Sequence, residues 1–122
     1  MTINDAISSV DTLKHNTFER SHKIRWLSEV DSMVKREILD THEGETTGYT
    51  GYVSDQPGDT VLLVPEPYDV LYLRWLEAMI DYQNGEYGRF NNAMALFNTS
   101  YQSYADYYHR THRPKGGGAF RL

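Results

Sequence analysis

Two histidines near the C-terminus stand at a spacing that metal sites use. His109 and His112 are three residues apart, which places both imidazoles on one face of a helix, where they could ligate zinc. A protein zinc site takes three or four ligands, yet the chain has no cysteine and Asp106 is the one carboxylate nearby. We therefore expect no metal site. We interpret the pair as complementing the negative end of a helix dipole or as part of a polar interface.

Other patterns that could support catalysis or cofactor binding are also incomplete. Glu43 and Glu45 form a possible carboxylate pair, but they stand in a segment rich in glycine and threonine, where exposure to solvent is the expected state. Several serines and five histidines show no recognisable Ser/His/Asp arrangement. Gly116–Gly118 precede no helix, so they do not form a phosphate-binding loop. We expect a protein that is not an enzyme and binds no cofactor.

The length and composition fit one domain. The 122 residues, 39% of them hydrophobic, can build a single core. We expect one helical domain over residues 1–114 and a flexible C-terminal arm over residues 115–122, because Pro114 stops a helix and three glycines follow it. The absence of cysteine excludes disulfides. No apolar run reaches the roughly 18 residues of a membrane span, and the N-terminus lacks signal-peptide features, so we expect a soluble protein.

Charge is distributed unevenly along the chain. Residues 105–122 contain four cations and one anion, a net charge of +3. Because the whole chain has a net charge of −5, residues 1–104 have a net charge of −8. An acidic body disfavours wrapping around a nucleic-acid duplex. The basic end could meet phosphate or an acidic protein surface, because blocks of charge determine association and orientation more than fold.

The longest regular apolar repeat predicts a helix over residues 87–111. Large apolar residues recur there at alternating spacings of three and four, which is one seam of an α-helix and the predicted core seam of the protein. The seam residues are Tyr87, Phe90, Met94, Phe97, Tyr101, Tyr104 and Tyr108.

A second helix, from Tyr68 to Tyr82, precedes this repeat and is apolar nearly all round. We therefore expect it to be a central helix with contacts on several sides. Asn84-Gly85 separates the two helices, and so short a connection makes them antiparallel neighbours. Pro67 suits the first turn of the central helix, where its missing N–H costs nothing. The predicted fold is mainly α: a small helical bundle built on a long antiparallel helical hairpin.

Two further helices are predicted nearer the N-terminus. Thr2 and Asp5 resemble a capping box at the start of a short first helix. Ser21 can cap a second helix, whose apolar positions recur at three or four from Ile24 to Ile38. Charged residues occupy the opposite face of that second helix, which is typical of a solvated surface. They are Lys23, Arg25, Glu29, Asp31, Lys35 and Arg36.

A short β-like or loop insertion is expected near residues 45–64. Its glycine-rich part disfavours helix, and the run Thr60–Val64 is β-branched and aliphatic. One or two short strands would be only marginally stable within one chain, and a sheet completed by a neighbouring subunit would stabilise them. The alternative is a strand-like run that packs on the helices. The subunit-interface candidates are Tyr49, Tyr52, Val61 and Leu63. The ten tyrosines of the chain fit subunit interfaces, and packing on amphipathic helices explains most of them equally well.

Two stretches of the sequence resemble a known protein family. They are VPEPYD at Val64–Asp69 and YxNGEYxRFNNAMxxFN at Tyr82–Asn98, within a similarity that covers about residues 15–114. On these motifs the chain resembles small structural proteins of tailed bacteriophages and prophages, namely the head-to-tail connector or adaptor proteins, also called head completion proteins.

The resemblance implies helical subunits that assemble as a ring, usually of twelve, beneath the portal of the virion. Such a ring extends the DNA channel and gives the tail its docking surface, so the implied partners are the portal protein and tail or stopper proteins. DNA would pass through without sequence-specific binding, and assembly would take place in the host cytoplasm without a membrane. In such adaptors the C-terminal segment commonly reaches the portal. The corresponding portal-interaction candidates here are Arg113, Lys115, Phe120, Arg121 and Leu122.

Two alternative functions remain at this stage. One is a tail-side completion or terminator ring, which composition does not distinguish from an adaptor. The other is a small helical DNA-binding or packaging regulator. The acidic body, and the lack of a short helix, glycine turn and basic recognition helix, count against that regulator.

Overall fold

The computed structural model describes residues 1–44 and 47–115, and within them the chain is mainly helical. The elements in chain order are α1 (Ile3–Leu13), α2 (Arg20–Val34), a π-helical turn η1 (Lys35–Leu39), α3 (Val70–Gln83) and α4 (Tyr87–Thr111). The predicted fold class, a small helical bundle, is confirmed.

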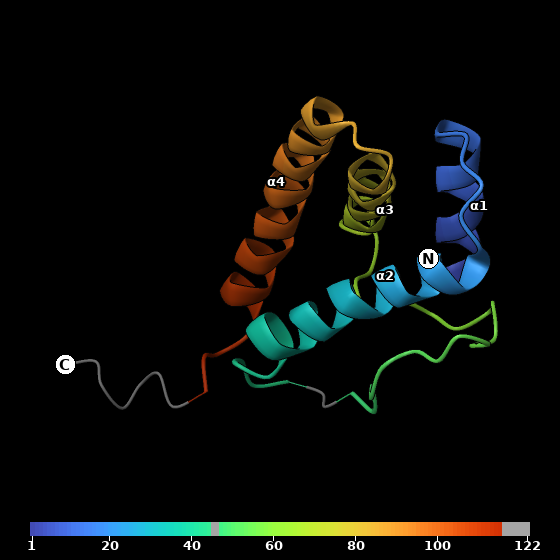
Figure 1. The fold of residues 1–122 in the computed structure, drawn as a ribbon. Helices are drawn as coiled ribbons and strands as arrows, with labels where there is room; N and C mark the ends of the chain where they lie inside the picture. Colours follow the sequence, from blue (N-terminus) through green and yellow to red (C-terminus); the bar gives the residue numbers. More distant parts are fainter. Residues whose placement is uncertain (45–46, 116–122) are drawn as a thin grey trace.

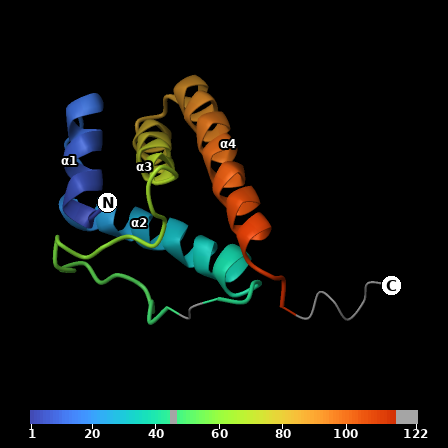
Figure 2. The same cartoon turned by 180° about the vertical axis from the view of Figure 1, so that it is seen from behind.

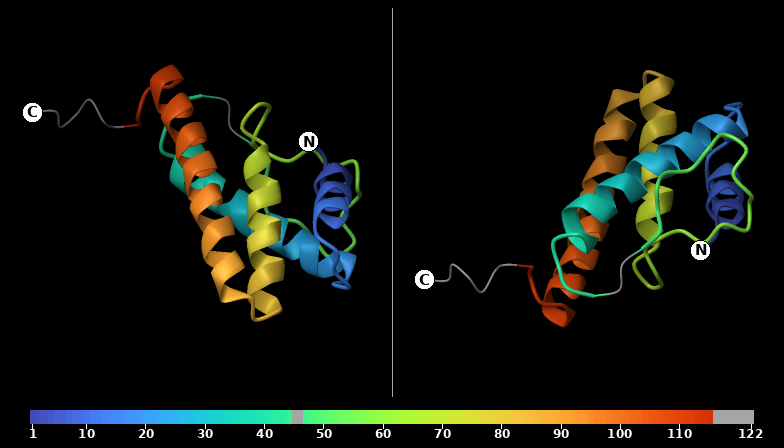
Figure 3. Two further views of the ribbon diagram at one scale, coloured as in Figure 1. Left: turned by 90° about the horizontal axis from the view of Figure 1, so that it is seen from above. Right: turned by 90° about the horizontal axis from the view of Figure 1, so that it is seen from below.

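Three helices lie side by side in one layer, and the fourth crosses beneath them. Helix α3 occupies the middle of the layer, with α1 on one side and α4 on the other (Figure 1). The view from behind shows the same arrangement (Figure 2). Seen from above and below, α2 runs across one face of the layer (Figure 3). Helix α3 therefore contacts α1, α2 and α4, as its nearly continuous apolar sequence predicted.

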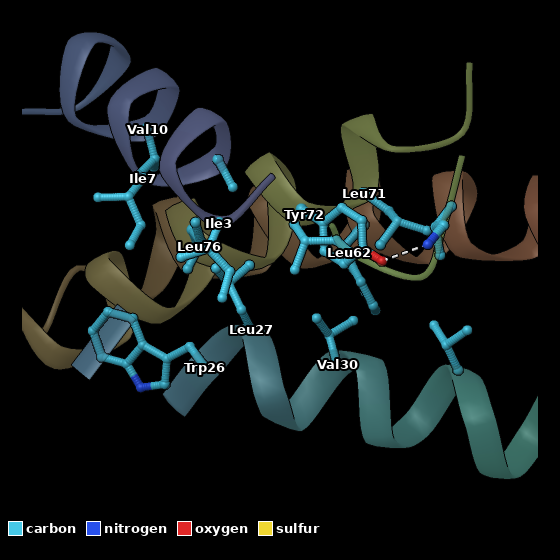
Figure 4. Packing of buried hydrophobic residues seen from close by; sticks show 14 of the residues in the cluster. Ile3, Ile7, Val10, Trp26, Leu27, Val30, Leu62, Leu71, Tyr72 and Leu76 are labelled. Atoms are coloured by element: carbon cyan, nitrogen blue, oxygen red, sulfur yellow. Dashed lines mark hydrogen bonds between the residues drawn. The ribbon is translucent and has the colours of Figure 1, made fainter. Parts of the chain in front are cut away.

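The core forms where α3 meets α1 and α2. Leu71, Tyr72, Leu76 and Ile80 of α3 are fully buried. The labelled apolar side chains of α1 and α2 converge on α3 in Figure 4. Phe97, Tyr104 and Tyr108 of α4 belong to the same core. Burial of side chains of this size contributes about 1.5 to 3 kcal/mol each, so the packing of the other helices on α3 supports the fold.

The long hairpin joins α3 to α4 through Asn84-Gly85. Gly85 has φ +74°, a left-handed conformation that glycine adopts without steric cost and that ends α3. Of the seven predicted seam residues of α4, three are buried and three are half-buried; Tyr87 is 59% exposed. The prediction that Tyr87 lies in the core is wrong. This residue lies in the first turn of α4, at the tip of the hairpin, where its ring contacts that of Tyr82, which is also exposed.

The predicted helix starts are partly correct. Thr2 and Asp5 do form a reciprocal capping box at α1. Ser21 is not the N-cap: the N-cap is Glu19, two residues earlier, and its side chain makes no capping hydrogen bond. Pro67 lies before α3 rather than in its first turn, since the helix begins at Val70 after Asp69, and the Glu66–Pro67 peptide bond is cis.

The described residues between η1 and α3 form a loop. Two isolated antiparallel bridges, Thr2 with Val61 and His42 with Pro114, replace the one or two strands that the composition allowed. The first bridge joins Thr60 and Leu62 to the N-terminus through backbone hydrogen bonds of 3.0 Å. The strand-like run is thus packed on the helices, with Leu62 and Val64 buried.

Candidate functional site

The residues that follow α4 are held against the segment that follows η1. The Glu43 N–H donates to the carbonyl of Arg113 at 2.6 Å, and the Lys115 N–H donates to the carbonyl of Thr41 at 2.9 Å. Two of the predicted portal-interaction residues, Arg113 and Lys115, therefore have backbones attached to the folded body. The other three candidates, Phe120, Arg121 and Leu122, lie outside the described residues.

Aromatic rings and imidazoles support this junction. The ring of His112 stacks on Tyr108 at 3.7 Å, and His42 meets Tyr108 edge-on at 5.4 Å. His42 also reaches α4 directly, with its Nε2 3.3 Å from Nδ1 of His109. Gly44 passes so close that a Cβ there would lie 2.9 Å from the His112 ring, so any other residue at that position would displace the ring. The junction is a packed structure that fixes where the neighbouring cations project.

Three cations project from this junction: Arg110, Arg113 and Lys115, which we call the basic corner. All three are exposed, and none forms an ion pair within residues 1–44 and 47–115. The nearby carboxylate of Asp106 accepts a hydrogen bond from Gln102 instead. Most cations elsewhere have acidic partners, for example Lys14 with Asp81 at 2.8 Å. The basic corner is thus an unneutralised patch on an otherwise acidic chain.

The structure separates the two histidines whose spacing resembled a zinc site. His109 contacts His42, whereas His112 stacks on Tyr108 and places its Nδ1 3.2 Å from the Tyr108 carbonyl. Within the described part of the chain, no three histidine or carboxylate side chains gather closely enough to hold a metal ion. Of the possible carboxylate pair, Glu43 is exposed and Glu45 lies outside the described residues.

A second unusual group is a buried carboxylate on α2. Asp31 is fully buried; its Oδ1 accepts a hydrogen bond from the Tyr72 hydroxyl at 2.6 Å, and its Oδ2 accepts bonds from the Tyr52 hydroxyl and the Leu63 N–H. Burial raises the pKa of Asp31 above its usual value, and these hydrogen bonds partly oppose the rise. All its contacts are with the protein itself. Asp31 therefore ties α2 to α3 and to the connecting loop, and we assign it no reaction.

The sequence interpretation of the α2 charges was wrong at two positions. Asp31 is fully buried and Lys23 is 4% exposed, although both were assigned to the solvated face. Lys23 is paired with Asp11 at 2.7 Å, and Asp31 has the three donors just described, so both polar groups are compensated. A signal was present: Ile24, Leu27, Asp31, Val34 and Ile38 follow the same alternating three and four spacing, so Asp31 lies on the buried seam.

The four predicted subunit-interface residues occupy different environments. The hydroxyl of Tyr49 donates to the Ser28 carbonyl at 2.7 Å, and that of Tyr52 bonds to Asp31, so both tyrosines are used inside the chain. Leu63 is partly buried against the core, whereas Val61 is 68% exposed. Their interface role stays a prediction. Much of the tyrosine surplus serves internal packing, including a stack of Tyr68 on Tyr107.

Comparisons with known proteins identify no relative of this chain. No family model, no curated protein and no solved structure matches it. No helix in the described residues combines the length and the apolarity needed to cross a bilayer.

Proposed function

We propose that this chain is a structural protein of a tailed-bacteriophage virion, a head-to-tail connector that forms a ring beneath the portal and docks the tail. The observation that carries the proposal is the basic corner. Its three cations have no ion-pair partner in the described residues, and the packed junction beneath them fixes their positions. Such an arrangement fits a docking contact, because a preorganised charged patch steers and orients a partner of opposite charge.

The partner that this patch fits is an acidic protein surface. A portal protein that presents carboxylates would pair with Arg110 and Arg113, whose guanidinium groups bind carboxylates in a bidentate manner. The predicted arm residues Phe120, Arg121 and Leu122 would extend the same contact. The acidic remainder of the chain repels the phosphates of DNA, which suits a channel through which DNA passes without sequence-specific binding.

Ring formation requires two different complementary faces on each subunit. Large apolar side chains are exposed on two separate parts of the described chain. Leu13, Val53 and Val61 belong to α1 and the long connection, whereas Tyr82, Tyr87 and Leu96 belong to the α3–α4 hairpin. Helices α1 and α4 lie on opposite sides of α3 (Figure 1). The two sets therefore support side-by-side contacts between neighbouring subunits.

Charge reversal at the basic corner tests the docking contact. We expect the triple variant Arg110→Glu, Arg113→Glu, Lys115→Glu to bind the portal protein of the same phage at least about tenfold more weakly, a change of about 1.4 kcal/mol. Its melting temperature should stay within about 2 °C of the wild type, because surface substitutions change stability little. The control is Arg25→Glu, because Arg25 is an exposed arginine of α2 that forms no ion pair with the described residues. Equal portal binding by the triple variant and the wild type would contradict the proposal.

A further inference from the structure

Two imidazoles meet where the segment after η1 packs on the last turn of α4. Nε2 of His42 lies 3.3 Å from Nδ1 of His109, and the two ring planes are 82° apart. This is a different pair from His109 and His112, whose spacing along the chain resembled a zinc site. Because His42 and His109 are 67 residues apart in sequence, only the fold brings them together.

The His42 ring is held so that one of its nitrogens has a free lone pair. Its Nδ1 lies 2.7 Å from the carbonyl oxygen of Ile38, which can only accept a hydrogen bond. In the neutral ring Nδ1 therefore has the proton and Nε2 has the lone pair. The backbone of His42 is fixed by its bridge to Pro114. Histidines that ligate metals normally donate their other N–H to a carbonyl or carboxylate in this way, so His42 is preorganised as a ligand through Nε2.

The distance between the two nitrogens fits a shared metal ion. Zinc binds a histidine nitrogen at about 2.0 to 2.1 Å, so two ligands of a tetrahedral zinc site are about 3.3 to 3.4 Å apart. In the metal-free protein the same distance allows Nδ1 of His109 to donate a hydrogen bond to Nε2 of His42. The ring of His109 is exposed, so its Nε2 can take up that proton when an ion replaces it between the two rings.

We propose that His42 and His109 bind a zinc ion, with water completing its tetrahedral coordination. Imidazole nitrogen suits zinc and the neighbouring late transition metals, whereas Mg²⁺ and Ca²⁺ require oxygen ligands. Within the described part of the chain, no third histidine or carboxylate lies close enough to join the pair. We therefore expect weaker binding than at sites with three or four protein ligands.

Charges of both signs neighbour this histidine pair. Glu43 follows His42 in sequence, and Asp106 lies about one turn before His109 on α4; both carboxylates are exposed. The basic corner opposes a further cation, but its side chains are also exposed, so water and salt screen the repulsion. A bound ion would link the segment after η1 to α4 and so reinforce the junction beneath the basic corner. The site goes beyond the connector function and requires no portal.

Calorimetric titration of the full chain with zinc chloride tests the site. We expect one ion per chain, and we expect His109→Ala to raise the dissociation constant at least about tenfold. Because the His109 side chain is exposed, the metal-free variant should melt within about 2 °C of the wild type. The matched control is His15→Ala, which removes an exposed imidazole from the connection between α1 and α2 and should bind zinc like the wild type. Zinc should also raise the melting temperature of the wild type more than that of His109→Ala, since it binds the folded pair.

Co²⁺ provides a readout of the geometry, because tetrahedral Co²⁺ absorbs visible light far more strongly than octahedral Co²⁺. The wild type should give the strong spectrum and His109→Ala should lose it, and an octahedral spectrum of the wild type would overturn the assigned coordination. Zinc binding that is equally tight in His109→Ala, or a wild type that binds no zinc, overturns the site itself. Failure of the protein to bind a portal would count against the connector function and would leave this site standing.

Discussion

Removing the Tyr72 hydroxyl tests the buried network around Asp31. This hydroxyl donates to Oδ1 of Asp31 at 2.6 Å and accepts the Val64 N–H at 2.7 Å, and the tyrosine is fully buried. Tyr72→Phe keeps the ring but leaves two buried polar groups unpaired, each at a cost of about 1 to 3 kcal/mol. Because Asp31 retains the donors Tyr52 and Leu63, we expect a total loss of about 3 kcal/mol in the free energy of unfolding.

Urea denaturation followed by circular dichroism measures this loss. For a domain of this size, about 3 kcal/mol corresponds to a fall of roughly 12 °C in melting temperature, which a thermal scan can check. The matched control is Tyr82→Phe, because Tyr82 is 51% exposed and its hydroxyl makes no hydrogen bond within the described residues. We expect a change below about 0.5 kcal/mol in the control. A loss below about 1 kcal/mol for Tyr72→Phe would refute the role assigned to the network.

Four further outcomes follow from the same structure. Asp31 has a raised pKa in the folded state, so its contribution to stability is complete below its ordinary pKa of 3.8 and is lost as the pH rises through the raised value. The free energy of unfolding of the wild type relative to Asp31→Asn should therefore fall as the pH rises above about 4, and a constant difference in urea titrations would contradict this. Phe97→Ala should cost about 3 to 5 kcal/mol, because Phe97 is 3% exposed, and an unchanged thermal melt would refute its place in the core. Gly44→Ala should lower the melting temperature by several degrees by displacing the His112 ring, whereas an equally stable variant would show that the junction adapts. A chain ending at Pro114 should melt within about 2 °C of the intact protein yet fail to join heads to tails, and infectious particles completed with it would show that the arm is dispensable.

Local sequence signals predicted the helices well. The α1 capping box and the turn at Gly85 depend on residues only a few positions apart, so their chemistry can be read from the chain directly. The periodic seam of α4 likewise predicted the buried Phe97 and Tyr104. It placed Tyr87 in the core as well, because periodicity does not show where the neighbouring helix ends.

Contacts between distant residues could not be read in this way. The partners of Asp31 include Tyr52 and Tyr72, which are 21 and 41 residues away in sequence, so an aspartate on the buried seam looked like part of a charged surface. His42 and His109 are 67 residues apart, and no local pattern places them together. The basic corner was predictable as charge, but its attachment to Thr41 and Glu43 depends on this long-range packing.

The central proposal is that this chain assembles as a ring on a bacteriophage portal. Electron microscopy of the purified protein mixed with the portal protein of the same phage, with mass measurement of the complex, tests it most directly. The account predicts a closed ring of this chain seated on the portal, with the basic corner, Arg110, Arg113 and Lys115, at the contact. Monomers that leave the portal bare at high protein concentration would contradict it.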